Sequence, residues 1–152
     1  MTTYLEAYDL VAGVVRSAWT TAGTVTEELP LQWDGVRGET PGESPIGSGD
    51  SGAFGRFTLR TSSRGLEAQG GERIRRFGTI ANLAVQVFAP WGDGGDLARR
   101  MAEVVLGALD GYVGSSSGVW FDEVVPLELG RLGDHYQINV AAVVRYQTRR
   151  AI

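Results

Sequence analysis

Two short glycine-rich patterns could carry chemistry. Gly47-Ser-Gly-Asp-Ser-Gly52 has the spacing of a dinucleotide-binding turn, in which glycines let the backbone approach a pyrophosphate. Gly114-Ser-Ser-Ser-Gly118 has the spacing of a nucleophile elbow. Ser116 would be the nucleophile there, and Asp122 and His135 follow it in the order of a hydrolase triad. Both chemistries depend on the surrounding elements, because each pattern needs a strand before it and a helix after it.

The sequence around both patterns does not predict the required order of a strand before the pattern and a helix after it. The segment 47–52 lies in a glycine-rich stretch and precedes a strand, and the segment 114–118 lies between a helix and a strand. His135 is the single histidine of the chain and is expected at a turn. We therefore expect neither nucleotide binding nor catalysis. A small serine hydrolase that uses Ser116 and His135 is a distant alternative.

Aspartates in glycine-rich turns are a third candidate for chemistry, because carboxylates bind Ca²⁺. These residues are Asp50, Asp93 and Asp96. Their spacing does not approach that of an EF-hand loop. Asp93 or Asp96 is better placed to cap a helix, where a side-chain oxygen accepts hydrogen bonds from free backbone N–H groups. We expect neither a metal site nor a cofactor.

The composition is that of one soluble globular domain. The chain has 152 residues, of which 43% are apolar and 21% charged, enough for one core but not for a second full domain. It contains no cysteine, so disulfides, thiolate metal sites and cysteine nucleophiles are excluded. Its 14 basic residues, all arginine, and 18 acidic residues give a net charge of -4, which disfavours a duplex-binding surface. No apolar stretch approaches the roughly 18 residues of a membrane-spanning helix, and the N-terminus lacks the build of a signal peptide.

Two amphipathic helices are predicted. Thr3 and Glu6 form a capping box, so we expect a helix to begin there and to extend over 4–21. A second helix is expected over 96–111, where apolar residues recur at three- and four-residue steps. The apolar stripes contain Tyr4, Tyr8, Val11, Val15, Ala18 and Trp19 in the first helix and Leu97, Met101, Val104, Val105, Ala108 and Leu109 in the second. Each helix has one apolar side, so both can lie on one face of a sheet.

Other segments alternate apolar and polar residues with a period of two, the pattern of half-buried strands. We expect strands over 29–33, 53–61, 73–89, 119–129 and 136–148, with an exposed loop over 34–52 and a polar connection over 62–72. Pro30 confines the first strand to the start or rim of a sheet. The predicted fold class is α+β, a single domain over 1–152 with a mostly antiparallel four- to five-stranded sheet and two amphipathic helices packed on one face.

Arg73, Arg75 and Arg76 form a dense cluster of positive charge. Three guanidinium groups within four residues favour an acidic partner. They also make the start of their strand too polar for the centre of a sheet, so we expect this part to project beyond the body. The net charge of the chain favours carboxylates of a partner subunit over DNA, and a solvated strand end is the alternative interpretation.

Most of the chain resembles a known family. The likeness rests on Phe77-Gly-Thr-Ile-Ala-Asn-Leu-Ala-Val-Gln-Val-Phe-Ala-Pro90, on the turn and helix that follow it, and on Tyr136-Gln-Ile-Asn-Val-Ala-Ala-Val-Val-Arg-Tyr146. The N-terminal helix and Leu31-Gln-Trp-Asp34 fit the same plan. In this order the segments resemble the tail terminator proteins of long-tailed bacteriophages. The resemblance implies a virion protein that forms a hexameric ring on the tail tube, halts tube polymerisation and provides the surface for head–tail joining.

The same resemblance implies the partners of the chain. They are copies of itself, the tail tube protein and the head–tail connector or completion protein, with genomic DNA passing through the lumen without specific binding. The implied location is the head-proximal end of the virion tail, and the host cytoplasm during assembly. A connector protein or the tube protein of the same particle is the nearest alternative. A tube protein grows into long cylinders, whereas a terminator stops at one ring.

Simple geometry is consistent with a ring of six. A compact domain of this length is a sphere about 38 Å across, and six such spheres leave a hole about as wide. A B-DNA duplex passes through a hole of that width. A closed ring also needs two different, complementary edges on each subunit. We expect the arginine cluster on one edge and Asp122-Glu123 on the other. Trp33 and Trp91 are candidates for further contacts, and a place at the edge of the core is the alternative interpretation. We expect 34–52 to order against a neighbour or the tube.

Overall fold

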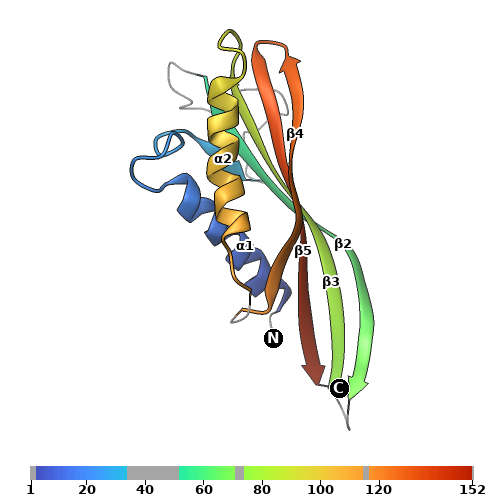
Figure 1. The fold of residues 1–152 in the computed structure, drawn as a ribbon. Helices are drawn as coiled ribbons and strands as arrows, with labels where there is room; N and C mark the ends of the chain where they lie inside the picture. The colour runs from blue at the N-terminus through green and yellow to red at the C-terminus, as the bar shows by residue number, and fades with distance from the viewer. Residues whose placement is uncertain (1–2, 34–51, 71–73, 115–116, 152) are drawn as a thin grey trace.

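The chain forms two helices and five strands. A computed structural model describes residues 3–33, 52–70, 74–114 and 117–151. Along the chain its elements are α1 (Tyr4–Trp19), β1 (Leu31–Trp33), β2 (Phe54–Gly70), β3 (Ile74–Pro90), α2 (Asp96–Asp110), β4 (Val119–Leu132) and β5 (His135–Ala151) (Figure 1). This order and the α+β class are those predicted. The expected loop over 34–52 lies, except for Gly52, outside the described residues.

The sheet is mixed, which corrects the prediction of a mostly antiparallel sheet. Its strand order is β1-β2-β3-β5-β4. The pairs β2–β3, β3–β5 and β4–β5 are antiparallel, but β1 runs parallel to β2, with Leu31 opposite Gly55. Parallel neighbours need a long crossover, and the residues between Trp33 and Phe54 are numerous enough to supply one. Pro30 stands just before this edge strand, as expected.

β2 is much longer than its sequence pattern indicates. The expected polar connection over 62–72 is wrong, because β2 continues to Gly70 and pairs with β3 as far as Ile74. Figure 1 shows the ends of β2, β3 and β5 running past both helices. We call residues 62–70, 74–80 and 145–151 the arm, and the remainder of the chain the body. The prediction that the start of the second long strand projects is therefore confirmed.

The length of the strands makes the molecule elongated. β2, β3 and β5 each contain 17 residues. At about 3.3 Å per residue, a straight strand of this length spans about 56 Å. The sphere about 38 Å across that served for the ring estimate is therefore too short in the direction of the strands.

The helix starts follow from local hydrogen bonding. The capping box is confirmed, because Thr3 Oγ1 accepts from the backbone N–H of Glu6 at 3.1 Å and the Thr3 backbone N–H donates to Glu6 Oε2 at 3.2 Å. α1 ends at Trp19, two residues before the expected end, and α2 ends at Asp110, one residue before. Such differences of one or two residues are usual where the last turn of a helix frays.

The core lies between the helices and one face of the sheet. Figure 1 shows both helices on the same side of the strands. Tyr8 of α1 sets its ring edge-on against Phe57 of β2, with ring centroids 6.0 Å apart. α2 contacts β3, β4 and β5 as well as α1. The fully buried side chains at this interface include Trp19, Phe57, Leu83, Met101, Val11, Val15, Val85, Val87, Val105 and Val119.

The opposite face of the sheet is only partly polar. Asn82 is exposed and Asn139 half-buried, but Gln137 is buried and donates to Asn139 Oδ1 at 2.8 Å. On the same face Phe54 and Phe88 stack with ring centroids 4.6 Å apart. One end of this face therefore has its own aromatic packing.

Candidate subunit interface

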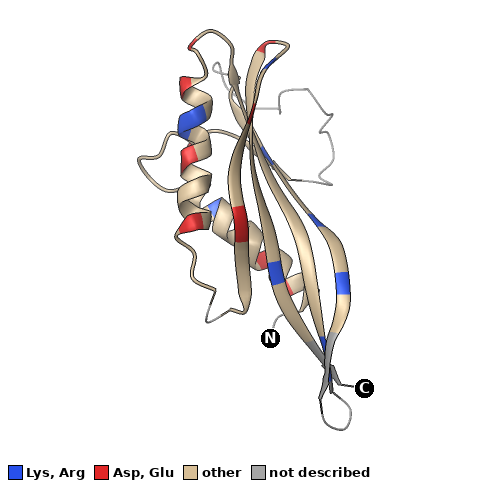
Figure 2. Cartoon of the chain, turned by 45° about the vertical axis from the view of Figure 1, so that its right-hand side comes forward, with Lys and Arg blue, Asp and Glu red and all other residues tan. Residues whose placement is uncertain are grey.

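The arm carries a concentration of positive charge. Its sequence contains six arginines and one glutamate, a net charge of +5 in a chain of net charge -4, so the rest of the chain carries -9. Figure 2 shows arginines along the arm and acidic residues along α2, α1 and β4. The two parts of the molecule are thus opposite in charge.

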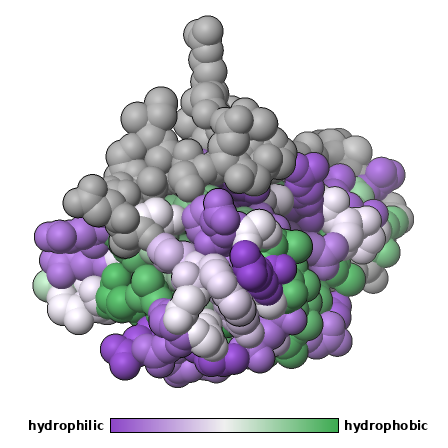
Figure 3. Space-filling model, turned by 90° about the horizontal axis from the view of Figure 1, so that it is seen from above, coloured by the Kyte–Doolittle hydropathy of each residue, from purple (hydrophilic) through white to green (hydrophobic). Residues whose placement is uncertain are grey.

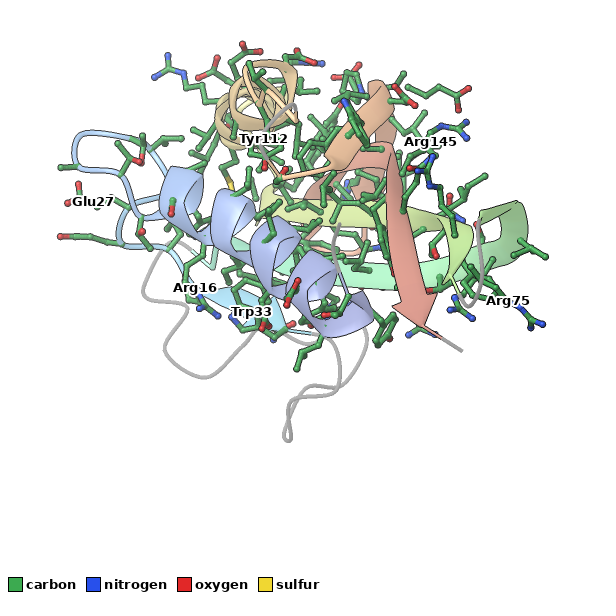
Figure 4. All side chains as sticks on the ribbon, turned by 90° about the horizontal axis from the view of Figure 1, so that it is seen from below. Arg16, Glu27, Trp33, Arg75, Tyr112 and Arg145 are labelled. Atoms are coloured by element: carbon green, nitrogen blue, oxygen red, sulfur yellow. The ribbon has the colours of Figure 1, made fainter. Side chains whose placement is uncertain are left out.

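The predicted arginine cluster lies at the far end of the arm. Arg75 is exposed and Arg76 is half-buried, and neither forms an ion pair with a described residue, whereas Arg73 lies outside the described residues. The register pairs them with Arg150 and Arg149 of β5. Like charges in such cross-strand positions are destabilising unless counter-charges reach them. Figure 4 shows Arg75 pointing away from the body at this end.

The helix-side face of the arm combines charge with apolar surface. Phe77 alternates with the buried Thr79 and Ala81, so its side chain is on the face that carries the helices farther along the sheet. The guanidinium carbon of Arg64 lies 4.2 Å from the centroid of the Phe77 ring. Leu66 is 53% exposed next to this pair.

The other face of the arm holds a shallow groove. Gly65 and Gly78 face each other across β2 and β3, and the absence of two side chains opens a hollow of about 420 Å³. Trp120, Arg145 and Ile80 are among the residues that line it. This face of the arm is therefore hollowed at the two glycines, and the exposed Arg145 lies beside the hollow.

Asp122 and Glu123 do not form a free acidic edge. Asp122 Oδ2 accepts from Arg145 Nε of the neighbouring strand at 2.6 Å. Glu123 is exposed in the bulge between Asp122 and Val125, with a φ of 52°. The Asp122 carboxylate already has a partner in its own chain, although an exposed pair of this kind contributes little to stability. The assignment of both residues to a subunit edge stays a prediction.

The two predicted tryptophans lie away from the arm. Trp33 packs against Phe57, with ring centroids 4.8 Å apart, and Arg16 covers its ring at 4.5 Å. Trp91 follows β3 at the end opposite Arg75, about 50 Å along the strand, and is 51% exposed under the guanidinium of Arg131. Figure 4 shows Trp33 and Arg16 side by side and distant from Arg75. The structure does not bring the tryptophans and the arginine cluster together.

The end of the molecule opposite the arm has scattered apolar residues. Trp91, Leu129 and Leu132 are each about half-exposed there. Figure 3 looks onto this end and shows apolar patches separated by polar residues. Scattered exposed apolar residues of this kind are ordinary on a soluble protein surface.

An acidic stripe on α2 was missed by the sequence reasoning. Asp96, Glu103 and Asp110 recur every seven residues, which is almost two helical turns, and all three are exposed. Asp96 Oδ2 accepts from Arg100 Nε at 3.0 Å. Glu103 and Asp110 form no ion pair with a described residue. The seven-residue spacing of these carboxylates is the signal in the sequence that indicates this stripe.

The described residues offer little for catalysis. His135 Nε2 is 3.0 Å from the carbonyl oxygen of Gly52. It begins β5, whereas Val119, which follows Ser117 and Gly118, pairs with Tyr146, about 36 Å along the same strand. The described part of the elbow pattern is thus far from the histidine; Ser116, Asp50 and residues 47–51 lie outside the described residues. No three His, Asp or Glu side chains among the described residues are grouped to hold a metal ion, and no described helix is long and apolar enough to cross a membrane.

Asp93, one of the two residues expected to cap the second helix, caps α2. Its Oδ1 accepts from the backbone N–H of Gly95 at 2.9 Å and its Oδ2 from that of Leu97 at 3.1 Å. The hydrogen bond from Leu97, and then that from Gly95, lowers the pKa of Asp93 below its ordinary value near 3.8. The two bonds hold the turn between β3 and α2.

This cap predicts a specific loss of stability in acid. A lowered pKa in the folded state means that the carboxylate stabilises the fold fully above the ordinary pKa and loses this effect as the pH falls through the lowered value. We expect Asp93→Asn to be less stable than the parent protein near neutral pH, and the gap to narrow toward pH ~2. Urea unfolding of both proteins across this pH range measures the gap. A difference in the free energy of unfolding that is constant with pH would show that the charge of Asp93 does not contribute to stability.

Comparison with known proteins shows the fold. No family model and no curated protein matches the chain. Among solved structures, 13 chains match. One of them aligns with 93% of this chain and 96% of its own length, with a TM-score of 0.52 and 18% sequence identity, and its name states no activity. The chain therefore shares its α+β fold with a solved structure of almost the same extent.

Proposed function

We propose that this protein is a structural component of a long-tailed bacteriophage, a tail terminator. In this function six copies form a ring on the last ring of the tail tube, stop its polymerisation and provide the surface for head–tail joining. The observation that carries the proposal is the projecting basic arm on a body of opposite charge. A closed ring with heterologous contacts needs two such different, complementary edges on every subunit.

The sequence resemblance supports the same proposal. The two segments that carry it lie in β3 and β5, the central neighbours of the sheet. With both helices packed on one face, the mixed sheet turns its other face toward a neighbour or the lumen. The protein acts through its shape and contacts, and no residue has a chemical step to perform.

The charge distribution also constrains how DNA passes the ring. Clustered arginines bind phosphates by releasing counterions, and a wall that binds DNA hinders its sliding. The arms therefore lie between subunits or outside the lumen, and the acidic body lines it. The partners are the tube protein below and the connector or completion protein above, at the head-proximal end of the tail, after assembly in the host cytoplasm.

Electron microscopy tests the proposal. We expect negative-stain images of the purified protein to show single rings, and mixtures with purified tube protein to show tubes that are capped and stop growing. Long cylinders formed by this protein alone would identify it as a tube protein. Rings that leave tube growth unchanged would identify a connector protein instead. A serine-directed fluorophosphonate is expected to leave the protein unlabelled, and stoichiometric labelling would contradict a purely structural function.

A further inference from the structure

We propose that the helix-side face of the arm docks on the outer face of α2 of a second copy of this chain. The inference rests on the proposed function, because it names the contact that closes the ring. It assigns the acidic side of that contact to Glu103 and Asp110 rather than to Asp122, whose carboxylate is already bound to Arg145.

The arm side of the contact is a basic surface with an apolar centre. Arg64 and Arg75 lie on the helix-side face with Phe77 between them, and Leu66 adds an exposed apolar side chain. The register places Arg64 opposite Thr79, four residues from Arg75, so the backbone positions of the two arginines are about 13 Å apart along the strands, and the Arg64 guanidinium lies over Phe77 between them. Neither helix extends over this part of the arm (Figure 1).

The α2 side has the complementary pattern. Glu103 and Asp110 are exposed on one line of the helix and about 10.5 Å apart along its axis, close to the spacing of the two arginines. Val113, just beyond the helix and past Asp110, is 71% exposed and adds an apolar side chain at this end of the surface. Apolar side chains next to charge pairs are the arrangement expected of an interface with a polar rim.

The charges favour a second copy over a nucleic acid as the partner. The arm carries +5 and the rest of the chain -9, so one copy offers both halves of the contact, whereas a polyanion would be repelled by most of the surface. Figures 1 and 4 show the arm and α2 on different sides of the molecule. The proposed contact is heterologous, from the arm of one copy to α2 of the next, and such a contact forms a ring where the rotation between copies closes.

Two single charge reversals and their combination test this contact. Arg75→Glu places a glutamate opposite Arg150, and Asp110→Arg places a cation at a helix C-terminus, so both variants are expected to fold. Each single variant should weaken self-association at least about tenfold in sedimentation or mass photometry, at about 100 mM salt. The double variant Arg75→Glu/Asp110→Arg should recover most of the loss, because the reversed charges attract again.

Matched controls separate this contact from a general charge effect. Arg131→Glu and Asp134→Arg make the same changes in net charge at the opposite end of the molecule, and we expect neither to alter association. Rings that form in both single variants as they do in the wild-type protein would overturn the docking and leave the proposed function intact. A double variant whose loss of association equals the sum of the two single losses would do the same. Arm-dependent rings that fail to cap tubes would support the docking and contradict the terminator function.

Titration with labelled duplex DNA provides the remaining outcome. We expect weak binding that is unaffected by Arg75→Glu. Tight, salt-dependent binding that Arg75→Glu abolishes, with unchanged self-association, would make the arm a nucleic-acid site and overturn the proposal. A wild-type protein that stays monomeric at every concentration would overturn it as well.

Discussion

Trp19→Ala is expected to lower the free energy of unfolding by about 3 to 5 kcal/mol, the range for removing a large side chain from a core. Trp19 is 1% exposed at the end of α1. Its ring lies directly over Gly55 of β2, where an added Cβ would overlap with it. Its Nε1 donates to the carbonyl oxygen of Leu29 at 2.8 Å, so the substitution removes packing and a hydrogen bond together. Urea unfolding followed by circular dichroism measures the loss.

An exposed tryptophan serves as the control. Trp120 is 46% exposed, and Trp120→Ala should change the free energy of unfolding by only about 0.5 kcal/mol. The contact with Gly55 also predicts non-additive effects. Gly55→Ala should be strongly destabilising in the parent protein and much less so in the Trp19→Ala background. Equal losses for Trp19→Ala and Trp120→Ala would contradict the placement of Trp19 in the core.

The amphipathic elements were predictable because burial on one side leaves a periodic pattern. The stripe from Tyr8 to Trp19 faces the sheet, and Phe57 and Val85 alternate with polar residues along their strands. The capping box of Thr3 and Glu6 is a local feature and needs no tertiary information. Helix number, strand number and their order follow from such patterns.

The β2 part of the arm was not predictable in the same way because no helix covers it. Residues 62–66 of β2 are exposed, so selection for burial leaves no apolar alternation there. Two register shifts, at Thr61/Ser63 and Leu66/Ala68, break what alternation exists. Pairing with β3 maintains this strand through backbone hydrogen bonds, which depend little on residue type. A glycine- and serine-rich strand of this kind looks like a loop in sequence.

The candidate interface was predictable on one side only. Arg75 and Arg76 are adjacent in sequence, so their charge is visible at once. The pairing of Arg75 and Arg76 with Arg150 and Arg149 depends on the β3–β5 register, and the hydrogen bond from Arg145 to Asp122 depends on the β4–β5 register. The choice of α2 as the acidic side requires knowing which carboxylates already have partners, and this is a property of the folded chain.

The turn between α2 and β4 gives a structural reason for the glycine that begins the elbow-like pattern. Gly114 begins the elbow-like sequence, and a Cβ on this residue would overlap with the backbone oxygen of Val119. The Gly118 backbone N–H donates to the carbonyl oxygen of Gly114 at 2.9 Å, which closes the turn. Glycine is therefore required here because two backbone segments approach each other closely. Backbone atoms cannot move aside as the end of a flexible side chain could.

Gly114→Ala is accordingly expected to destabilise the protein by about 3 kcal/mol, the upper part of the range for forced overpacking. Gly107→Ala is the matched control, since Gly107 lies on the open side of α2 with no atom near its added Cβ, and alanine there should stabilise the helix by up to about 1 kcal/mol. Thermal and urea unfolding of both variants measure the difference. If the glycine served a nucleophile instead, Gly114→Ala would leave unfolding unchanged and abolish reaction with a fluorophosphonate. Opposite shifts in stability for the two variants, with no labelling of the parent protein, would show that Gly114 is required by the backbone geometry at the start of β4. This strand forms one edge of the sheet.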